Sequence, residues 1–251
     1  MKIAQRWETK GYAQNARFVT DLGLPVLDLL DPQPGERILD LGCGDGVLGM
    51  KMVKLGCQVL GLDSSPAFVD AALELGLDAR LMDATALDFE FVFNAVFSNA
   101  VLHWVKEQDT EKMMDGVWRS LRNSGRFVAE LGGEGNVQAI QEALHAALKA
   151  RGIDPVAVDP WYYPSAEAYT SKLQDAGFRV QQMLLIPRPT VLPGSLTAWL
   201  ETFAGPFKAA LAPADQPAFF EEVQEALRPR LFSHGVWTAD YVRLRFVAIK
   251  P

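Results

Sequence analysis

The sequence has few cysteines and histidines, and its charge balance is acidic. Two cysteines among 251 residues cannot build a disulfide framework. Those cysteines and the three histidines have no spacing that would hold structural zinc, so no metal is expected. The net charge of −7 argues against nucleic acid as a partner, because a basic surface is needed to neutralise phosphates.

Long apolar runs are absent as well. The sequence contains no stretch of about 18 uncharged apolar residues that could cross a membrane, and its first residues lack the apolar segment of a secretion signal. At 49% hydrophobic and 22% charged residues, the composition is that of a folded globular protein. The sequence therefore predicts a soluble, cytoplasmic protein with no membrane partner.

Short apolar runs alternate with stretches of helical spacing between residues 37 and 131. The expected strands are residues 37–41, 58–62, 79–82, 95–98 and 126–131. The expected helices are 47–55, 65–75 and 109–121, and the second begins with Ser65 as a hydroxyl cap and Pro66 in the first turn. This alternation predicts an α/β fold with a doubly wound parallel sheet.

The pattern changes after residue 131. The expected elements there are a helix over 136–151 capped by Asn136, a helix over 165–176, and strands over 178–186 and 241–249. The segment at about 188–238 is too long for a plain loop, so it is expected to fold as a helical lid over the ligand edge of the sheet. The expected organisation is a leader at 1–35, a core at 36–131, a helical cap at 132–177, and the last strands with their insertion at 178–251.

The most specific motif is the glycine turn, Asp-Leu-Gly-Cys-Gly-Asp-Gly at 40–46. Three glycines permit positive φ and close approach of a ligand to backbone N–H groups, whereas an ordinary strand–helix turn needs one. A nicotinamide site requires Gly-x-Gly-x-x-Gly, but the sixth position from Gly42 is Val47. A phosphate-binding Gly-Lys-Ser/Thr is absent, and Asp40 would repel a diphosphate. Asp40 suits a ligand with an ammonium group, and S-adenosylmethionine has one and carries no phosphate.

Two further acids lie at the next strand ends. Asp63 lies seventeen residues beyond Gly46, at the distance expected for an acceptor of ribose hydroxyls. Asp83 could accept the adenine amino group while the N–H of Ala84 meets a ring nitrogen. Each acid alone is more often solvated than ligand-binding. In register with Asp40, they predict a single ligand site.

These residues, together with Phe-Ser-Asn-Ala-Val-Leu-His-Trp at 97–104, resemble the class I S-adenosylmethionine-dependent methyltransferases. Within that superfamily the chain resembles the trans-aconitate methyltransferase-like small-molecule branch, through Trp7 and Tyr12, the Leu-His-Trp at 102–104, and the long helical insertion. The core resemblance covers residues 36–131. One departure is Asn94, where the family usually has Asp, so a role that depends on charge is not expected there.

The resemblance implies a Rossmann-like seven-stranded sheet with an antiparallel last strand, and S-adenosylmethionine as cofactor. The residues that it places around the cofactor are Asp40, Gly42, Cys43 and Gly44 at the methionine end, Asp63 and Ser64 at the ribose, Asp83 and Ala84 at the adenine, and Asn99 and Ala100 beside the methionine. Tyr12 is similar to a tyrosine that related enzymes fold over the cofactor, and its alternative role is an aromatic anchor for the first helix.

Methyl transfer from a sulfonium requires alignment and exclusion of water, and a base only where the acceptor is a hydroxyl or an amine. His103 is the candidate base, and its alternative role is to shape the pocket floor. The expected acceptor is a small organic molecule, methylated at a carboxylate or hydroxyl oxygen, among lid aromatics and with Arg188, Arg243 and Arg245 as anion partners. Competing hypotheses are a non-catalytic cofactor-binding domain and a nicotinamide-dependent oxidoreductase. The expected assembly is a monomer or a homodimer.

Overall fold

The computed structural model describes residue 5 and residues 22–251. Among these, residues 22–134, 162–186 and 243–251 form a sheet unit. Residue 5 and residues 135–161 and 187–242 form a helical unit. Tyr12 and Trp7 lie outside the described residues.

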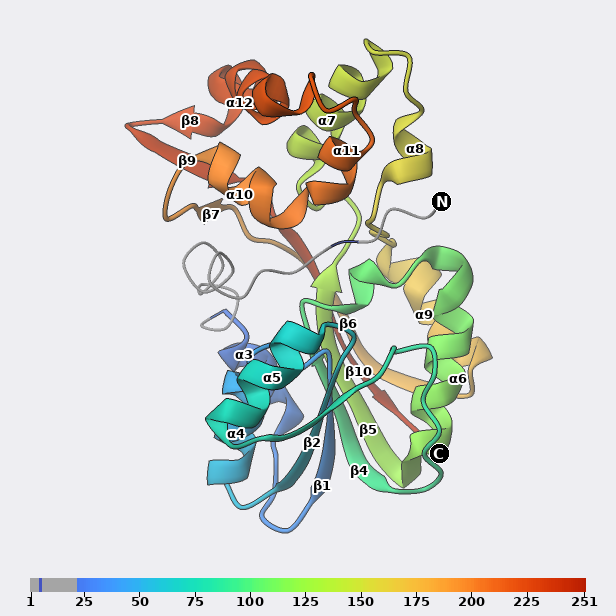
Figure 1. Ribbon diagram of the computed structural model, residues 1–251. Helices are drawn as coiled ribbons and strands as arrows, with labels where there is room; N and C mark the ends of the chain where they lie inside the picture. The colour runs from blue at the N-terminus through green and yellow to red at the C-terminus, as the bar shows by residue number, and fades with distance from the viewer. Residues whose placement is uncertain (1–4, 6–21) are drawn as a thin grey trace. The chain divides into compact units, whose positions relative to one another are not determined.

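The sheet unit is built on seven strands in the order β3-β2-β1-β4-β5-β10-β6 among the described residues (Figure 1). Their bounds are β1 Arg37–Leu41, β2 Gln58–Asp63, β3 Asp78–Leu81, β4 Phe93–Asn99, β5 Leu121–Gly132, β6 Arg179–Pro187 and β10 Val242–Ile249. The first five strands pair in parallel, and β10 runs antiparallel to β5. The predicted doubly wound sheet with an antiparallel last strand is confirmed.

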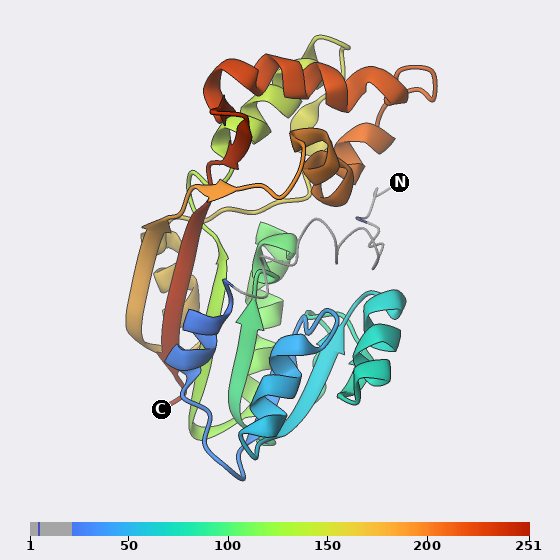
Figure 2. The ribbon, with the colours of Figure 1, turned by 90° about the vertical axis from the view of Figure 1, so that its left-hand side faces the viewer.

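Helices cover both faces of this sheet (Figure 2). One face packs against α3 (Leu24–Leu30), α4 (Val47–Lys54) and α5 (Pro66–Leu75). The other packs against α6 (Thr110–Ser120) and α9 (Ala166–Asp175). Of these two, α9 was expected in the helical cap at 132–177, and it belongs instead to the sheet unit. The short helices η1 (Leu102–Trp104) and η2 (Glu107–Asp109) join β4 to α6. Because both faces are covered, the parallel strands are apolar along most of their length.

Ser65 and Asn94 both form hydrogen bonds near the ends of elements in the sheet unit. Ser65 precedes α5 as expected, but its hydroxyl makes no capping bond, and its backbone N–H donates to Asp63 instead. Asn94 replaces the family's acid, and its side-chain oxygen accepts the N–H of Arg37 at 2.9 Å. A neutral amide therefore suffices to join the start of β4 to the start of β1.

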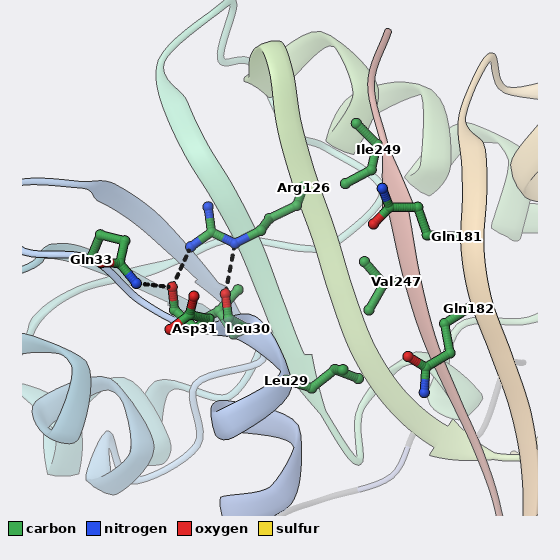
Figure 3. Close-up of a pocket in the computed structure, with 9 residues that line it drawn as sticks. All are labelled: Leu29, Leu30, Asp31, Gln33, Arg126, Gln181, Gln182, Val247 and Ile249. Carbon is green, nitrogen blue, oxygen red and sulfur yellow. Dashed lines mark hydrogen bonds between the residues drawn. The ribbon is translucent and has the colours of Figure 1, made fainter.

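Arg126 fixes the end of α3 to the sheet. Its guanidinium donates to the carbonyls of Leu30 and Asp31 and to both oxygens of Glu36 (the carbonyl bonds are drawn in Figure 3). Asp31 ends the helix in a left-handed conformation, with φ of +50°, so its carbonyl cannot join a helical bond. Arg126 thus satisfies the carbonyls of Leu30 and Asp31, the latter together with the side chain of Gln33.

We expect Arg126→Met to lower the free energy of unfolding by about 2–4 kcal/mol at pH 7, because it removes charge-assisted hydrogen bonds that are largely shielded from solvent. The bonds from Arg126 lower the pKa of Glu36, so this stability is present above the ordinary carboxyl pKa of 4.5. It is lost as pH falls through the lowered value. Urea unfolding at pH 7 and pH 3 checks both effects, with exposed Arg122→Met as the control. Equal losses for the two variants would contradict this role.

The helical unit consists of α7 (Gln138–Lys149), α8 (Pro155–Val158), α10 (Leu196–Phe203), α11 (Gly205–Ala209) and α12 (Gln216–Leu231), with a small sheet of β7 (Thr190–Val191), β8 (Phe232–Ser233) and β9 (Val236–Ala239). The predicted cap of α7 is wrong. Asn136 accepts the N–H of Val242, and Asp240 accepts the N–H of Ala139 at 2.8 Å. The cap comes from 101 residues further along the chain.

None of the helices in the described part of the chain has the length and apolarity needed to cross a membrane.

Candidate functional site

Asp40 lies in the middle of the sheet, near the carboxyl end of β1. Its neighbours across the strands are Gly61 of β2 and Phe97 of β4. The residue is 2% exposed, and its Oδ2 has no hydrogen-bond partner among the described residues. Burial raises the pKa of Asp40 to about 7, and the carboxylates of Asp63 and Asp45 add to the shift. A buried carboxylate among other acids can be stabilised by a cationic partner.

The glycine turn after β1 has one closed side and one open side. The N–H groups of Gly42 and Cys43 donate to the carbonyl of Leu62, at 2.7 and 2.9 Å, which fixes the turn to β2. Gly42 has a φ of +76°, and a Cβ there would lie 2.3 Å from the side chain of Val101. At Gly44, φ is +55° and a Cβ would meet no atom of the described residues within 4 Å. The turn therefore presents bare backbone at Gly44.

Asp63 joins the glycine turn to the end of β2. Its carboxylate accepts the N–H of Gly44 at 3.0 Å and the N–H of Ser65 at 2.9 Å. Burial raises the pKa of Asp63, and these hydrogen bonds oppose the shift. Each carboxylate oxygen has a further lone pair, so Asp63 can still accept ribose hydroxyls. Ser64, beside it, is exposed.

Asp83 follows β3 and is exposed. One carboxylate oxygen accepts both the N–H and the hydroxyl of Thr85, each at 2.7 Å. The N–H of Met82 donates to the carbonyl of Asp63, which brings this turn beside the end of β2. The turn that carries Asp83 and Ala84 therefore begins beside the backbone of Asp63. Thr85 was not predicted, although Asp-x-Thr is a common turn sequence.

Asn99 and Ala100 end β4 beside the same turn. The hydroxyl of Ser98 donates to the carbonyl of Leu41, which fixes this strand end to β1. Ala100 has a φ of +60°, and its N–H donates to the carbonyl of Glu130. A Cβ at Gly23, just before α3, would lie 2.8 Å from the amide nitrogen of Asn99. The start of α3 therefore passes directly beside Asn99.

Cys43 fills space within the turn. Its sulfur is buried and would lie 2.8 Å from a Cβ at Gly61. Burial raises the pKa of the Cys43 thiol, which opposes formation of a nucleophilic thiolate. The contribution of Cys43 to a ligand site is therefore its backbone N–H and its volume.

His103 lies in η1, three residues after Ala100, and is 7% exposed. Its Nδ1 accepts the N–H of Gly132 at 3.2 Å. The backbone carbonyl of His103 accepts the N–H of Tyr162, and its ring contacts those of Trp104 and Tyr163. Burial lowers the pKa of His103 well below 6.5, and the positive charge of Arg243 contributes. The imidazole is therefore neutral.

A buried charge cluster adjoins His103 and was not predicted as such. Glu130 of β5 is 1% exposed and accepts hydrogen bonds from Arg243 at 3.3 Å and from Arg245 at 2.7 Å. The sequence predicts both arginines as anion partners, on a strand face that is more often solvated. Here Arg243 is 4% exposed. Two guanidinium groups thus converge on one buried carboxylate.

The described lid aromatics divide between the two units. Trp161, Trp199 and Phe203 pack together in the helical unit, and all three are buried. Trp199 also donates to the hydroxyl of Tyr241 at 2.6 Å. In the sheet unit, Tyr163 lies beside His103. The first group is thus the core of the helical unit.

A hollow of about 580 Å³ lies elsewhere on the sheet unit, bordered by α3, β6 and β10 (Figure 3). Its residues include Ile249, at the end of antiparallel β10, and Arg126 of β5, which pairs with it. The glycine turn and the acids lie at the carboxyl ends of β1, β2 and β3. The hollow is therefore at the opposite edge of the sheet from the candidate site.

The observed arrangement fits S-adenosylmethionine. The unpartnered oxygen of Asp40 suits an ammonium group, and the open backbone at Gly44 suits close approach of the methionine end. Asp63 and Asp83 retain acceptor capacity for ribose and adenine. No group of three or more His, Cys, Asp or Glu in the described residues is arranged to hold a metal ion.

Comparison with known proteins gives matches to methyltransferases. Residues 38–125 match a family model described as a methyltransferase domain. An uncharacterised methyltransferase of Schizosaccharomyces pombe is 39% identical over 260 residues, an alignment covering 97% of this chain and 98% of that protein. Trans-aconitate 2-methyltransferase of Mycobacterium tuberculosis is 29% identical over 160 residues, covering 61% of this chain and 52% of that enzyme.

A solved structure supports the fold. Phosphoethanolamine N-methyltransferase 2 of Haemonchus contortus, in complex with phosphomonomethylethanolamine and S-adenosylhomocysteine, matches with a TM-score of 0.58 at 20% identity. The match covers 92% of this chain and 53% of that one. At this identity the likeness concerns the architecture of the sheet and its helices.

Proposed function

Because the chain belongs to the class I S-adenosylmethionine-dependent methyltransferases and uses S-adenosylmethionine as its cofactor, we propose that it methylates a small organic acceptor at an oxygen atom, foremost that of a carboxylate. The observation that carries this proposal is the buried cluster in which Arg243 and Arg245 share Glu130. Two guanidinium groups in this cluster, one of them close enough to His103 to affect its pKa, favour an anionic acceptor. The relatives named for trans-aconitate methylation support the same class.

The cofactor set is proposed as predicted, with the roles that the observed contacts support. Asp40 pairs with the ammonium group, and the turn at Gly42, Cys43 and Gly44 offers backbone to the methionine end. Asp63 and Ser64 serve the ribose. Asp83 and Ala84 serve the adenine, and Asn99 and Ala100 lie along the methionine. For Tyr12 the cofactor-covering role stays a prediction.

The bound cofactor supplies an activated methyl group on a sulfonium, so the protein has to align the acceptor and exclude water. A carboxylate acceptor is already a nucleophile and needs no base. The charge cluster orients such an acceptor by attraction, and the fixed strand ends keep the cofactor groups in register. In this proposal the strand ends bind the cofactor, and the charge cluster orients the acceptor.

A labelling experiment tests this function. The protein is incubated with methyl-labelled S-adenosylmethionine and a cell extract, and trans-aconitate serves as a defined test carboxylate. Label in a small-molecule fraction, released by mild base as expected for a methyl ester, supports the proposal. Label arriving only on protein or nucleic acid, or no transfer at all, contradicts it. No transfer to any fraction would favour a non-catalytic cofactor-binding domain.

Asp63→Ala is expected to weaken adenosylhomocysteine binding by about 1–3 kcal/mol through lost ribose hydrogen bonds. It should also lower stability, because the N–H groups of Gly44 and Ser65 lose their acceptor. Isothermal titration and thermal unfolding measure the two effects, with exposed Asp88→Ala as the control. Unchanged affinity in Asp63→Ala would refute the ribose role.

We also propose that the protein acts in the cytoplasm, as a monomer or homodimer, on an acceptor other than nucleic acid. The acidic net charge supports an acceptor other than nucleic acid. Both cysteines are free and buried, as suits a protein of the cytoplasm. Size-exclusion chromatography with light scattering tests the expected monomer or homodimer.

A further inference from the structure

The orientation of the His103 ring is fixed by one backbone hydrogen bond. Gly132, at the end of β5, donates its N–H to Nδ1. Nδ1 must therefore have a lone pair, and a neutral ring then carries its only ring-nitrogen proton on Nε2. The ring is neutral because it is buried and lies near the positive charge of Arg243.

The described contacts of His103 involve its ring faces, its Nδ1 and its backbone carbonyl, and none of them engages Nε2. Trp104 and Tyr163 lie against the ring, with centroids 5.5 and 5.8 Å from its own. The N–H of Tyr162 holds the backbone carbonyl of His103. The two nitrogens of an imidazole point in divergent directions, so Nε2 is directed away from Gly132. No described residue accepts a hydrogen bond from Nε2.

We infer that His103 is a hydrogen-bond donor to the acceptor, giving its Nε2–H to an oxygen of the anionic group that is methylated or of a neighbouring one. The inference rests on the proposed function, in which the acceptor is an oxygen anion. His103 and the cluster of Arg243, Arg245 and Glu130 would then hold the same anion, one through a neutral N–H and the other through charge. A neutral donor orients a nucleophilic oxygen without protonating it.

This geometry opposes the base role considered for His103. A general base must present a lone pair to the acceptor proton. The only lone pair of this neutral ring lies at Nδ1, and the N–H of Gly132 occupies it. Acting as a base would require the loss of that hydrogen bond and a cation beside Arg243, which is unfavourable.

A pair of substitutions separates the two ring nitrogens. In His103→Gln the side-chain amide can occupy the position of Nε2 and keep a donor, but the N–H of Gly132 loses its acceptor. In His103→Asn the amide oxygen can occupy the position of Nδ1 and keep that acceptor, but the donor to the substrate is lost. The Asn variant is expected to transfer the methyl group roughly 5–150-fold more slowly, with stability near wild type. The Gln variant is expected to transfer at a near-normal rate but to be less stable.

Transfer is measured with methyl-labelled S-adenosylmethionine and dilutions of the small-molecule extract fraction that accepts label from the wild-type protein. Thermal unfolding is measured in parallel. Transfer in the Asn variant equal to wild type overturns the inference and leaves the proposed function in place. A loss of a hundredfold or more in both variants, with adenosylhomocysteine binding retained, establishes a base and also overturns it. If the wild type transfers label to no small molecule, the proposed function and the inference fail together.

A second readout is independent of any acceptor. Long-range ¹H–¹⁵N spectra of the cofactor-free protein distinguish the two neutral tautomers of histidine and the imidazolium. With three histidines in the chain, His103→Gln assigns the signal by its loss. The expected signal is that of a neutral ring protonated on Nε2, unchanged between pH 5 and pH 8. A ring protonated on Nδ1, or one that titrates in this range, overturns the inference alone.

Discussion

Asp40→Asn is expected to weaken adenosylhomocysteine binding about a hundredfold, ~3 kcal/mol, while making the cofactor-free protein more stable at pH 8. The weaker binding follows because the ammonium group loses its only proposed charged partner. The gain in stability follows because the cofactor-free protein no longer buries an anionic carboxylate whose Oδ2 has no partner among the described residues. A substitution that raises stability and weakens binding is expected where a buried charge is kept for a ligand at the expense of stability.

The sign of the stability change depends on pH. The pKa of Asp40 is about 7 in the folded protein, above the ordinary value of 3.8, so folding favours the protonated form. Stability is therefore complete below pH 3.8 and is lost as pH rises through 7. Asn remains neutral throughout, so the variant should gain stability at pH 8 and gain none at pH 4.

Binding should show the matching pH dependence. In the wild-type protein, protonation of Asp40 below pH about 7 competes with the ammonium group, so the dissociation constant should rise, by at most tenfold per pH unit. In Asp40→Asn this dependence should disappear. Isothermal titration between pH 5.5 and 8.5 measures it, with exposed Asp70→Asn as the control. A variant that binds as tightly as wild type and is no more stable would contradict the role of Asp40.

Gly42→Ala and Gly44→Ala are expected to fail in different ways. At Gly42 the new Cβ would meet the side chain of Val101 in a backbone with φ of +76°, so the variant should lose about 2–4 kcal/mol of unfolding free energy. At Gly44 the Cβ would enter open space, so the main cost is the strain of positive φ, about 1 kcal/mol. Gly44→Ala should therefore fold, yet lose at least tenfold in adenosylhomocysteine affinity, because the Cβ occupies the space proposed for the ligand.

Urea unfolding and isothermal titration on the same preparations separate the two outcomes. The matched control is Gly35→Ala, which also has positive φ and an open Cβ position but lies outside the site. It should lose stability about as Gly44→Ala does and keep its affinity. If Gly44→Ala bound as well as Gly35→Ala, the open side of the turn would not face the cofactor.

The elements of the sheet could be predicted because their signals are local. The expected strands between residues 37 and 131 overlap β1 to β5, because each contains an apolar run bounded by Gly, Asp or Ser, and α4, α5 and α6 each have an apolar face. Parallel strands place their carboxyl ends at one edge, so Asp40, Asp63 and Asp83 could be placed at the same edge of the sheet from the sequence. The observed hydrogen bond from Gly44 to Asp63 shows the first two turns in contact.

Contacts between residues that lie far apart in the sequence could not be predicted. The pairing of Glu130 with Arg243 and Arg245 depends on the register of β5 against β10, which no local pattern specifies. The bond between His103 and Gly132 depends on how η1 lies against the end of β5. The cap of α7 was missed for the same reason, since Asp240 is brought to it by the chain's return to the sheet.

The central claim is that the carboxylate of Asp40 recognises the ammonium group of the cofactor. The direct measurement is isothermal titration of wild type and Asp40→Asn with adenosylhomocysteine and with its analogue lacking only the amino group. The account predicts that Asp40→Asn weakens adenosylhomocysteine about a hundredfold and leaves the weaker binding of the deaminated analogue nearly unchanged, a coupling of ~3 kcal/mol. Equal losses for both ligands would contradict it.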